Sequence, residues 1–264
     1  HYGWRAGMMI AGCMAIVVGI FLCWRLRDRP QALGLPAVGE WRHDALEIAQ
    51  QQEGAGLTRK EILTKYVLLN PYIWLLSFCY VLVYVVRAAI NDWGNLYLVQ
   101  RHGFELFSAN AAVSMFEIGG FLGSLFGGWG SDRFFHGNRA PMNLIFALGI
   151  FASVTALWLT PLDNFIVLSG CIFSIGFFVF GPQMMIGMAA AECSHKEAAG
   201  TATGFVGLFG YLGAALASYP LTLIIEQFSW EGFFSVITLS AACISLLILP
   251  FVKAQQRAET LSSP

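Results

Sequence analysis

The chain has 264 residues, of which 57% are hydrophobic, 14% are aromatic and only 12% are charged, and its formal net charge is −1. A soluble domain averages about 25% charged residues, so this composition and a mean hydropathy of +0.64 exclude a water-soluble protein. The composition predicts an all-α, polytopic membrane protein. Its continuous apolar runs do not fit the short alternating segments of a transmembrane barrel.

Seven segments are long and apolar enough to cross a bilayer, which requires about 20 residues of helix. The third and sixth are rich in glycine, which favours close helix packing in lipid. The first starts almost at His1 with no cleavable signal sequence before it, so we expect the chain to lack an N-terminal part of a longer protein. The seven segments are residues 5–24, 72–98, 108–128, 141–161, 165–190, 199–225 and 232–252.

A long polar stretch, residues 26–70, separates the first two segments. We predict that it forms an extended loop. Its last part, "TRKEILTKYVLLN", is predicted to form a short amphipathic helix at the membrane surface. We therefore divide the chain into a transmembrane helix (1–25), a central loop (26–70), a six-helix half (71–255) and a tail (256–264).

Basic residues orient the chain, because cytoplasmic loops carry an excess of lysine and arginine. One side of the predicted membrane holds twelve of them and the other side holds two, Arg5 and Arg101. The N-terminus of this chain is thus predicted to be outside, and its C-terminus in the cytoplasm of a bacterial inner membrane. The twelve are Arg25, Arg27, Arg29, Arg42, Arg59, Lys60, Lys65, Arg133, Arg139, Lys196, Lys253 and Arg257.

One arginine lies within an apolar segment, "SFCYVLVYVVRAAINDWGNLYLV". Charged side chains at this depth are costly and usually face a bundle interior or a cavity. Tyr80, Tyr84, Arg87 and Asn91 recur at intervals of three and four, which predicts a polar stripe on one helix face. The planar guanidinium donates two parallel hydrogen bonds to a phosphate, so the stripe is a candidate anion site.

A structural ion pair is the alternative for Arg87. Asp92 is five positions further on, about 140° around a helix, and is badly placed to neutralise it. Glu117, in the next segment, is a possible partner.

The fifth segment carries Pro182 and Gln183. Proline frees a backbone carbonyl and permits a kink. Gln183 shares a helical face with Phe180 and is predicted either to face a cavity or to bond a neighbouring helix.

The loop "GWGSDRFFHGNR" follows the third segment. Asp132 can pair with Arg133 or Arg139, or lie at the N-terminus of a neighbouring helix. We interpret these three residues as a structural latch that stabilises one conformation.

No pattern typical of an enzyme is present: the sequence has no Walker-type loop, zinc signature or serine nucleophile elbow. The histidines lie at ends or in loops without metal-ligand spacing, and the six cysteines mostly lie in apolar runs. We predict no enzyme activity, no metal, no cofactor and no nucleic-acid partner.

Six helices after a long loop match half of a major facilitator, with the first helix as the last of the N-terminal half. Two triplets with glycine-rich middle members agree with the inverted repeats of such a half. The stretches "NPYIWLLSFCYVLVYVVRAAINDWGNLYL", "GGWGSDRFFHGNR" and "GFFVFGPQMMIGMAAAECSHKEAAGTATGF" resemble the organophosphate:phosphate antiporter family of that superfamily. The resemblance covers essentially the whole chain and is closest to the family's bacterial hexose phosphate sensors.

This resemblance implies that Arg87 is one of two arginines that bind a substrate phosphate, with its partner in the N-terminal half. It also places Gln183 on a cavity-lining helix. Hexose phosphate transporters resemble D-G-x-K where this chain has Thr203 and Val206 at the charged positions, which makes full transport specificity doubtful. Two functions follow as expectations. One is a sensor of external hexose 6-phosphate that signals to a membrane histidine kinase. The other is an antiporter that exchanges sugar phosphate for inorganic phosphate.

Overall fold

The computed structural model describes residues 3–27, 30–36, 41, 58–135, 138–161 and 164–262, and this part of the chain contains helices and no strand. The predicted all-α fold is confirmed. The chain divides into two compact units, His1–Gly56 and Leu57–Pro264. Arg29 and Arg42 of the predicted central loop lie outside the described residues, as do His1, His43 and His136.

The first unit contains one long helix, α1 (Gly3–Arg25), followed by a short 3-10 turn, η1 (Pro30–Leu33). Residues 5–25 are apolar enough to span a membrane, as the sequence predicts.

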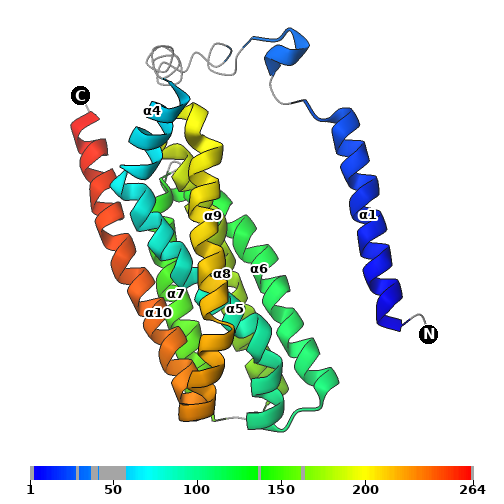
Figure 1. Ribbon diagram of the computed structural model, residues 1–264. Helices are drawn as coiled ribbons and strands as arrows, with labels where there is room; N and C mark the ends of the chain where they lie inside the picture. The colour runs from blue at the N-terminus through cyan, green and yellow to red at the C-terminus, as the bar shows by residue number, and fades with distance from the viewer. Residues whose placement is uncertain are drawn as a thin grey trace. The chain divides into compact units, whose positions relative to one another are not determined.

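The second unit is a bundle of long helices (Figure 1). The first four match the predicted spans to within a few residues at most ends, and α6 continues seven residues beyond its predicted end. They are α5 (Pro71–His102), α6 (Leu106–Phe135), α7 (Arg139–Leu159) and α8 (Phe165–Glu192).

The last two predicted spans lie within a single apolar segment, Lys196–Pro250. The predicted helix 199–225 is interrupted, because α9 (Ala199–Leu216) ends at a turn and α10 (Tyr219–Ser262) starts after it. The predicted tail, 256–264, continues α10 as far as Ser262.

The chain reverses direction at Ser229, inside α10, where φ is 56° and ψ is −160°. Gly210 lies against Tyr80, and Trp230 packs on Tyr97 near the far end of α5, so the chain reaches that end of the bundle at Ser229. From there α10 returns along the bundle to the C-terminus (Figure 1). A non-glycine residue in this backbone region costs on the order of 1–3 kcal/mol.

The predicted short amphipathic helix is present. It consists of α4 (Arg59–Leu63) and a π-helical turn, η2 (Thr64–Leu68). Ile62 and Val67 are buried in the core of the second unit, because both belong to the apolar side of this short helix. The segment therefore caps the bundle, and the boundary between units falls before it.

Hydrogen bonding joins this capping segment to the far end of α8. The side-chain amide of Asn70 donates to the backbone carbonyl of Cys193 at 2.9 Å. The Tyr66 and His195 rings pack with centroids 5.1 Å apart.

The bundle shows the pairwise symmetry that the two triplets predict. The middle helix of each triplet packs extensively on the first helix of the other, α6 on α8 and α9 on α5. The third helices, α7 and α10, contact each other, and each also packs on the first helix of the other triplet. Exchanging the triplets leaves this set of contacts unchanged, which is the expected relation of an inverted repeat.

Glycine residues lie at the closest contacts between helices of the bundle. A methyl group on Gly123 of α6 would overlap the backbone carbonyl of Phe177 in α8, and one on Gly213 of α9 would overlap that of Val81 in α5. These contacts explain the glycine content of both middle helices.

Candidate functional site

Four polar side chains meet where α5 packs against α8. The Tyr80 hydroxyl donates to the main-chain carbonyl of Gln183 at 3.1 Å, and the Gln183 Nε2 approaches the Tyr84 hydroxyl at 3.5 Å. The two tyrosine rings pack edge to face, with centroids 4.8 Å apart. Helical spacing places Tyr80, Tyr84 and Arg87 on one face of α5, and α8 brings Gln183 to the same place.

Arg87 is half-buried beside this cluster and contacts aromatic rings. Its guanidinium carbon lies 5.5 Å from the centroid of Tyr84 and 5.0 Å from that of Phe180. Both are within the range of cation–π attraction. These rings fix the position of the guanidinium while they leave its five N–H donors available.

The described part of the chain contains no ion pair that joins Arg87 to Glu117 or to Asp92. Glu117 is exposed, so the structural pair considered from sequence is absent. Asn91 is also exposed, and its amide donates to Asp92 Oδ1 at 3.1 Å. Neither Asn91 nor Glu117 belongs to the cluster around Arg87.

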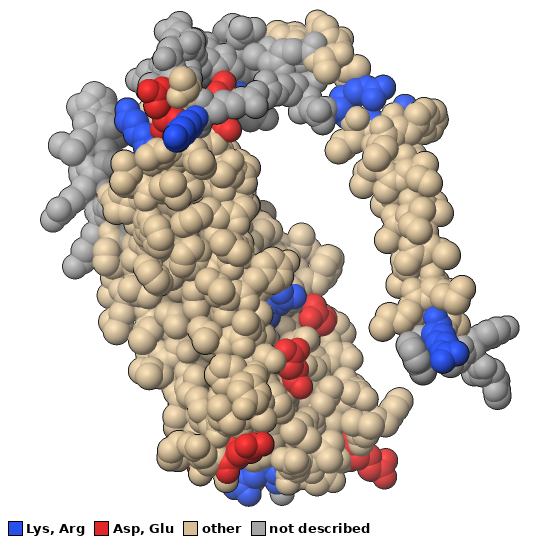
Figure 2. Space-filling view, viewed as in Figure 1, with Lys and Arg blue, Asp and Glu red and all other residues tan. Residues whose placement is uncertain are grey.

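The surroundings of Arg87 suit an anion. The side of the bundle seen in Figure 2 is mostly uncharged, and the two rings that contact the Arg87 guanidinium, those of Tyr84 and Phe180, carry no charge. In such surroundings the Arg87 guanidinium, the Tyr84 hydroxyl and the Gln183 amide can together bind a phosphate by charge-assisted hydrogen bonds. The buried Oε1 of Gln183 accepts no hydrogen bond from the described residues.

A second charged cluster lies where α6 and α8 end and α7 begins. Arg139 donates from Nη1 to Asp132 Oδ1 at 2.8 Å. Its Nε is 3.5 Å from Glu192 Oε1, an ion pair too long for a good hydrogen bond. Arg133 is exposed and forms no ion pair with the described residues. The sequence offered Arg133 and Arg139 as partners of Asp132, and the structure pairs Asp132 with Arg139. The second acid beside Arg139, Glu192, was not predicted from the sequence.

The two positions that differ from hexose phosphate transporters have different surroundings. Thr203 is exposed, and its hydroxyl donates to the carbonyl oxygens of Ala199 and Gly187. Val206 is completely buried in the core. A charged side chain at position 206 would therefore need a partner inside the bundle.

The described residues contain no cluster of side chains that could hold a metal ion. All six cysteines are free. The site consists only of hydrogen-bonding and aromatic groups.

A repeated triplet of membrane-spanning helices with a half-buried arginine on its first helix is typical of a class of transport proteins, and comparison with known proteins identifies the class. The family model described as Major Facilitator Superfamily matches residues 1–218. The chain belongs to this superfamily and is a multi-span membrane protein.

Particular relatives narrow the group. The chain is 75% identical, over 97% of its length, to the "Membrane sensor protein UhpC" of Escherichia coli (strain K12). It is 45% identical, over 97%, to the "Probable hexose phosphate transport protein" of Chlamydia trachomatis serovar D. It is also 31% identical, over 95%, to the "Hexose-6-phosphate:phosphate antiporter" of Escherichia coli (strain K12).

These matches cover 58%, 59% and 56% of the respective relatives. The chain therefore spans less than two thirds of their length. The resemblance drawn from the sequence motifs is confirmed, together with the major facilitator fold.

Proposed function

We propose that this chain belongs to a membrane sensor of external hexose 6-phosphate, and that it contributes the C-terminal part of the binding cavity. The observation that carries the proposal is Arg87, a half-buried cation held by aromatic rings without a carboxylate partner in the described part of the chain. The similarity to a protein named as a membrane sensor supports the choice among functions.

In this proposal Arg87 binds the phosphate and Tyr84 supplies a further hydrogen bond. Tyr80 and Gln183 join α5 to α8, so a ligand at Arg87 contacts a group that spans two helices. A ligand shifts a two-state protein only through different affinities for its two states. We propose that the two states differ in the contact between α5 and α8, and that this contact makes their affinities for the ligand different. Asn91 and Glu117 are exposed and do not contact Arg87 in this structure, and in this proposal they contact the ligand only at the edge of the site.

The further assignments are an inner-membrane location, a cytoplasmic C-terminus and a membrane histidine kinase that receives the signal. The excess of basic residues on one side supports the orientation. Asp132, Arg133 and Arg139 then lie on the cytoplasmic side, where the Asp132–Arg139 pair acts as a latch.

The alternative function is an antiporter that exchanges organophosphate for inorganic phosphate, favoured by the antiporter among the relatives. Thr203 and Val206 argue against it, because the transporters they are compared with resemble an acid and a lysine at those positions. Both functions use Arg87 in the same way.

One experiment separates the two functions. The protein, at the full length of its relatives, is reconstituted in vesicles with its candidate kinase, and glucose 6-phosphate is added to the outer side. We expect ligand-dependent kinase autophosphorylation with little exchange of labelled inorganic phosphate. Vigorous exchange without any effect on the kinase would contradict the sensor proposal. Arg87→Lys serves as the control for ligand dependence, since it removes the bidentate fork and keeps the charge.

A further inference from the structure

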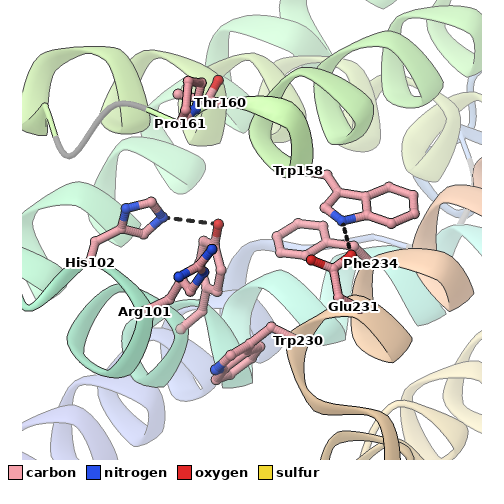
Figure 3. A pocket seen from close by; sticks show the side chains of 9 residues that line it. Arg101, His102, Trp158, Thr160, Pro161, Trp230, Glu231 and Phe234 are labelled. Atoms are coloured by element: carbon pink, nitrogen blue, oxygen red, sulfur yellow. Dashed lines mark hydrogen bonds between the residues drawn. The ribbon is translucent and has the colours of Figure 1, made fainter.

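A small cavity lies at the end of the bundle where α5 and α7 finish and where α10 starts again after Ser229. Figure 3 shows side chains from these three helices surrounding it. Its volume is about 160 Å³, which corresponds to roughly five water molecules. Ligand sites for drug-sized molecules are about 300–1,000 Å³, so this cavity suits a smaller group than a sugar phosphate.

Two opposite charges line the cavity without forming an ion pair. Arg101 comes from the last turn of α5, and Glu231 lies just after the reversal in α10. Within the described residues, the Arg101 guanidinium makes neither an ion pair nor a hydrogen bond to another side chain. The cavity therefore presents a cation and a carboxylate to the same small space.

The carboxylate is held in place. The Trp158 indole donates to Glu231 Oε2 at 2.8 Å, and Figure 3 shows this bond at one side of the cavity. The other oxygen, Oε1, accepts no hydrogen bond from the described residues. It is available to a donor within the cavity.

Aromatic rings form much of the remaining wall. Tyr97 and Trp230 pack with centroids 5.2 Å apart, and Trp158 stacks on Phe234 at 6.1 Å. The Tyr97 hydroxyl is bonded to His102 at 3.0 Å, which fixes that ring. Aromatic faces beside a carboxylate attract an ammonium group, most strongly where water is excluded.

The walls therefore select a small zwitterion, with its anionic group at Arg101 and its ammonium group between Glu231 and Trp230. The cavity lies at the ends of membrane spans, where tryptophan and tyrosine are enriched at the level of the lipid headgroups. This position favours the headgroup of a membrane lipid as the zwitterion. Leu159, between two lining residues in the sequence, and Phe228, two positions before Trp230, are 70% and 64% exposed, and they offer apolar surface to acyl chains.

We propose that this cavity binds the phosphoethanolamine headgroup of a membrane phospholipid. The phosphate accepts hydrogen bonds from Arg101, and the primary ammonium donates to Glu231 Oε1. A quaternary choline headgroup cannot make that donation, and a glycerol headgroup has no positive charge. The site is separate from the cluster at Arg87, so it adds to the proposed function and does not depend on it.

The test uses the full-length protein, delipidated in mild detergent and mixed with equal amounts of phosphatidylethanolamine, phosphatidylglycerol and phosphatidylcholine. Native mass spectrometry then measures which lipid is retained. We expect phosphatidylethanolamine to be retained about tenfold more than either of the others, as expected for one charge-assisted hydrogen bond. Soluble phosphoethanolamine should displace it, which shows that the headgroup is recognised. Equal retention of the three lipids, or no displacement, would overturn the proposal.

Two variants separate the contacts. Glu231→Gln should abolish the preference for phosphatidylethanolamine over phosphatidylglycerol, whereas Arg101→Gln should lower retention of all three lipids. Glu105→Gln is the matched control, because Glu105 is an exposed acid beside the end of α5 that does not line the cavity. Trp158→Phe is a conservative test of the same site, because it removes the hydrogen bond to Glu231 Oε2 and keeps an aromatic ring. Wild-type lipid preference in all three cavity variants would refute the site.

Discussion

Two arginines of the same helical bundle, Arg87 and Arg139, have opposite surroundings. Arg139 is 9% exposed and lies between two carboxylates, Asp132 and Glu192. Arg87 is half-buried against two aromatic rings, and the described residues give it no carboxylate. A buried ion pair is costly to break, because the remaining charge is left without compensation. The charge of Arg139 is compensated within the fold, whereas the charge of Arg87 is available to a ligand.

Replacing Arg87 gives the largest expected effect, and it tests directly whether Arg87, in contrast to Arg139, binds the ligand. Arg87→Lys should lower the affinity of the full-length protein for glucose 6-phosphate by about tenfold to a hundredfold, because the bidentate fork is lost. Its thermal stability should change little. Titration calorimetry measures the affinity, and Arg133→Lys, at an exposed arginine, is the control. Wild-type affinity in Arg87→Lys would remove the phosphate site from this residue.

Arg139→Gln should have the reverse signature. It leaves Asp132 and Glu192 without their shared cation, which should lower the free energy of unfolding by about 2 kcal/mol, below the 3–5 kcal/mol of a fully buried pair because both acids are partly exposed. Ligand affinity should change much less than in Arg87→Lys, because Arg139 does not contact the ligand and acts only through the balance between the two conformations. Thermal unfolding in detergent gives the comparison, with Arg133→Gln as the matched variant, expected within about 0.5 kcal/mol of wild type. Equal losses of stability in the two variants would show that the cluster around Arg139 contributes nothing.

Tyr84→Phe sharpens the description of the Arg87 site. The ring beneath the guanidinium is kept, and only the hydroxyl near Gln183 is lost. We expect about a fivefold weaker affinity for glucose 6-phosphate, the effect of one neutral hydrogen bond. Tyr219→Phe, at an exposed tyrosine of α10, should bind like wild type. A loss as large as that of Arg87→Lys would mean that the hydroxyl, and not the cation, dominates the site.

The smallest effect concerns an exposed acid. The Thr58 backbone N–H and hydroxyl both donate to Glu61 Oε2 at 2.8 Å, and these bonds lower the pKa of Glu61 below its ordinary value. Its contribution to the stability of α4 is therefore present above about pH 4.5, the ordinary value, and is lost as the pH falls through the lowered pKa.

Hydrogen exchange of the amides of α4 measures this contribution. Thr58→Ala should speed exchange about fivefold at neutral pH, as expected for a lost N-cap. The difference from wild type should shrink once Glu61 is protonated. A constant difference across this pH range would mean that the capping box does not include the carboxylate.

The membrane spans could be predicted because each needs about 20 apolar residues, and the described helices start and end close to the predicted positions. The break between α9 and α10 was not predicted, because the apolar run continues through it without charge. Pro220 was the available signal, since proline favours the first turn of a helix and disfavours helical geometry in the residue before it. The reversal at Ser229 falls in the gap between the predicted spans 199–225 and 232–252, where Glu226, Gln227 and Glu231 interrupt the apolar pattern.

The candidate site was predictable in part for a similar reason. Period 3.6 places Tyr80, Tyr84 and Arg87 on one face of α5, whereas the approach of Gln183 depends on how two helices pack. The predicted Glu117 partner fails because α6 packs on α8 through its glycine face, which leaves Glu117 exposed. Glu192 joins Arg139 only through tertiary packing, which the spacing of residues along the chain does not record.

The bond between Asn70 and the carbonyl of Cys193 has a mechanical consequence. It ties the residues that lead into α5 to the last turn of α8, which also carries Gln183 about ten residues earlier. Pro182, next to Gln183, lacks the N–H that would complete the helical ladder, so α8 has a weak point in its middle and a tether at its end. A displacement of α8 at Gln183 is therefore transmitted along the C-terminal third of the helix to the segment that enters the bundle at Asn70.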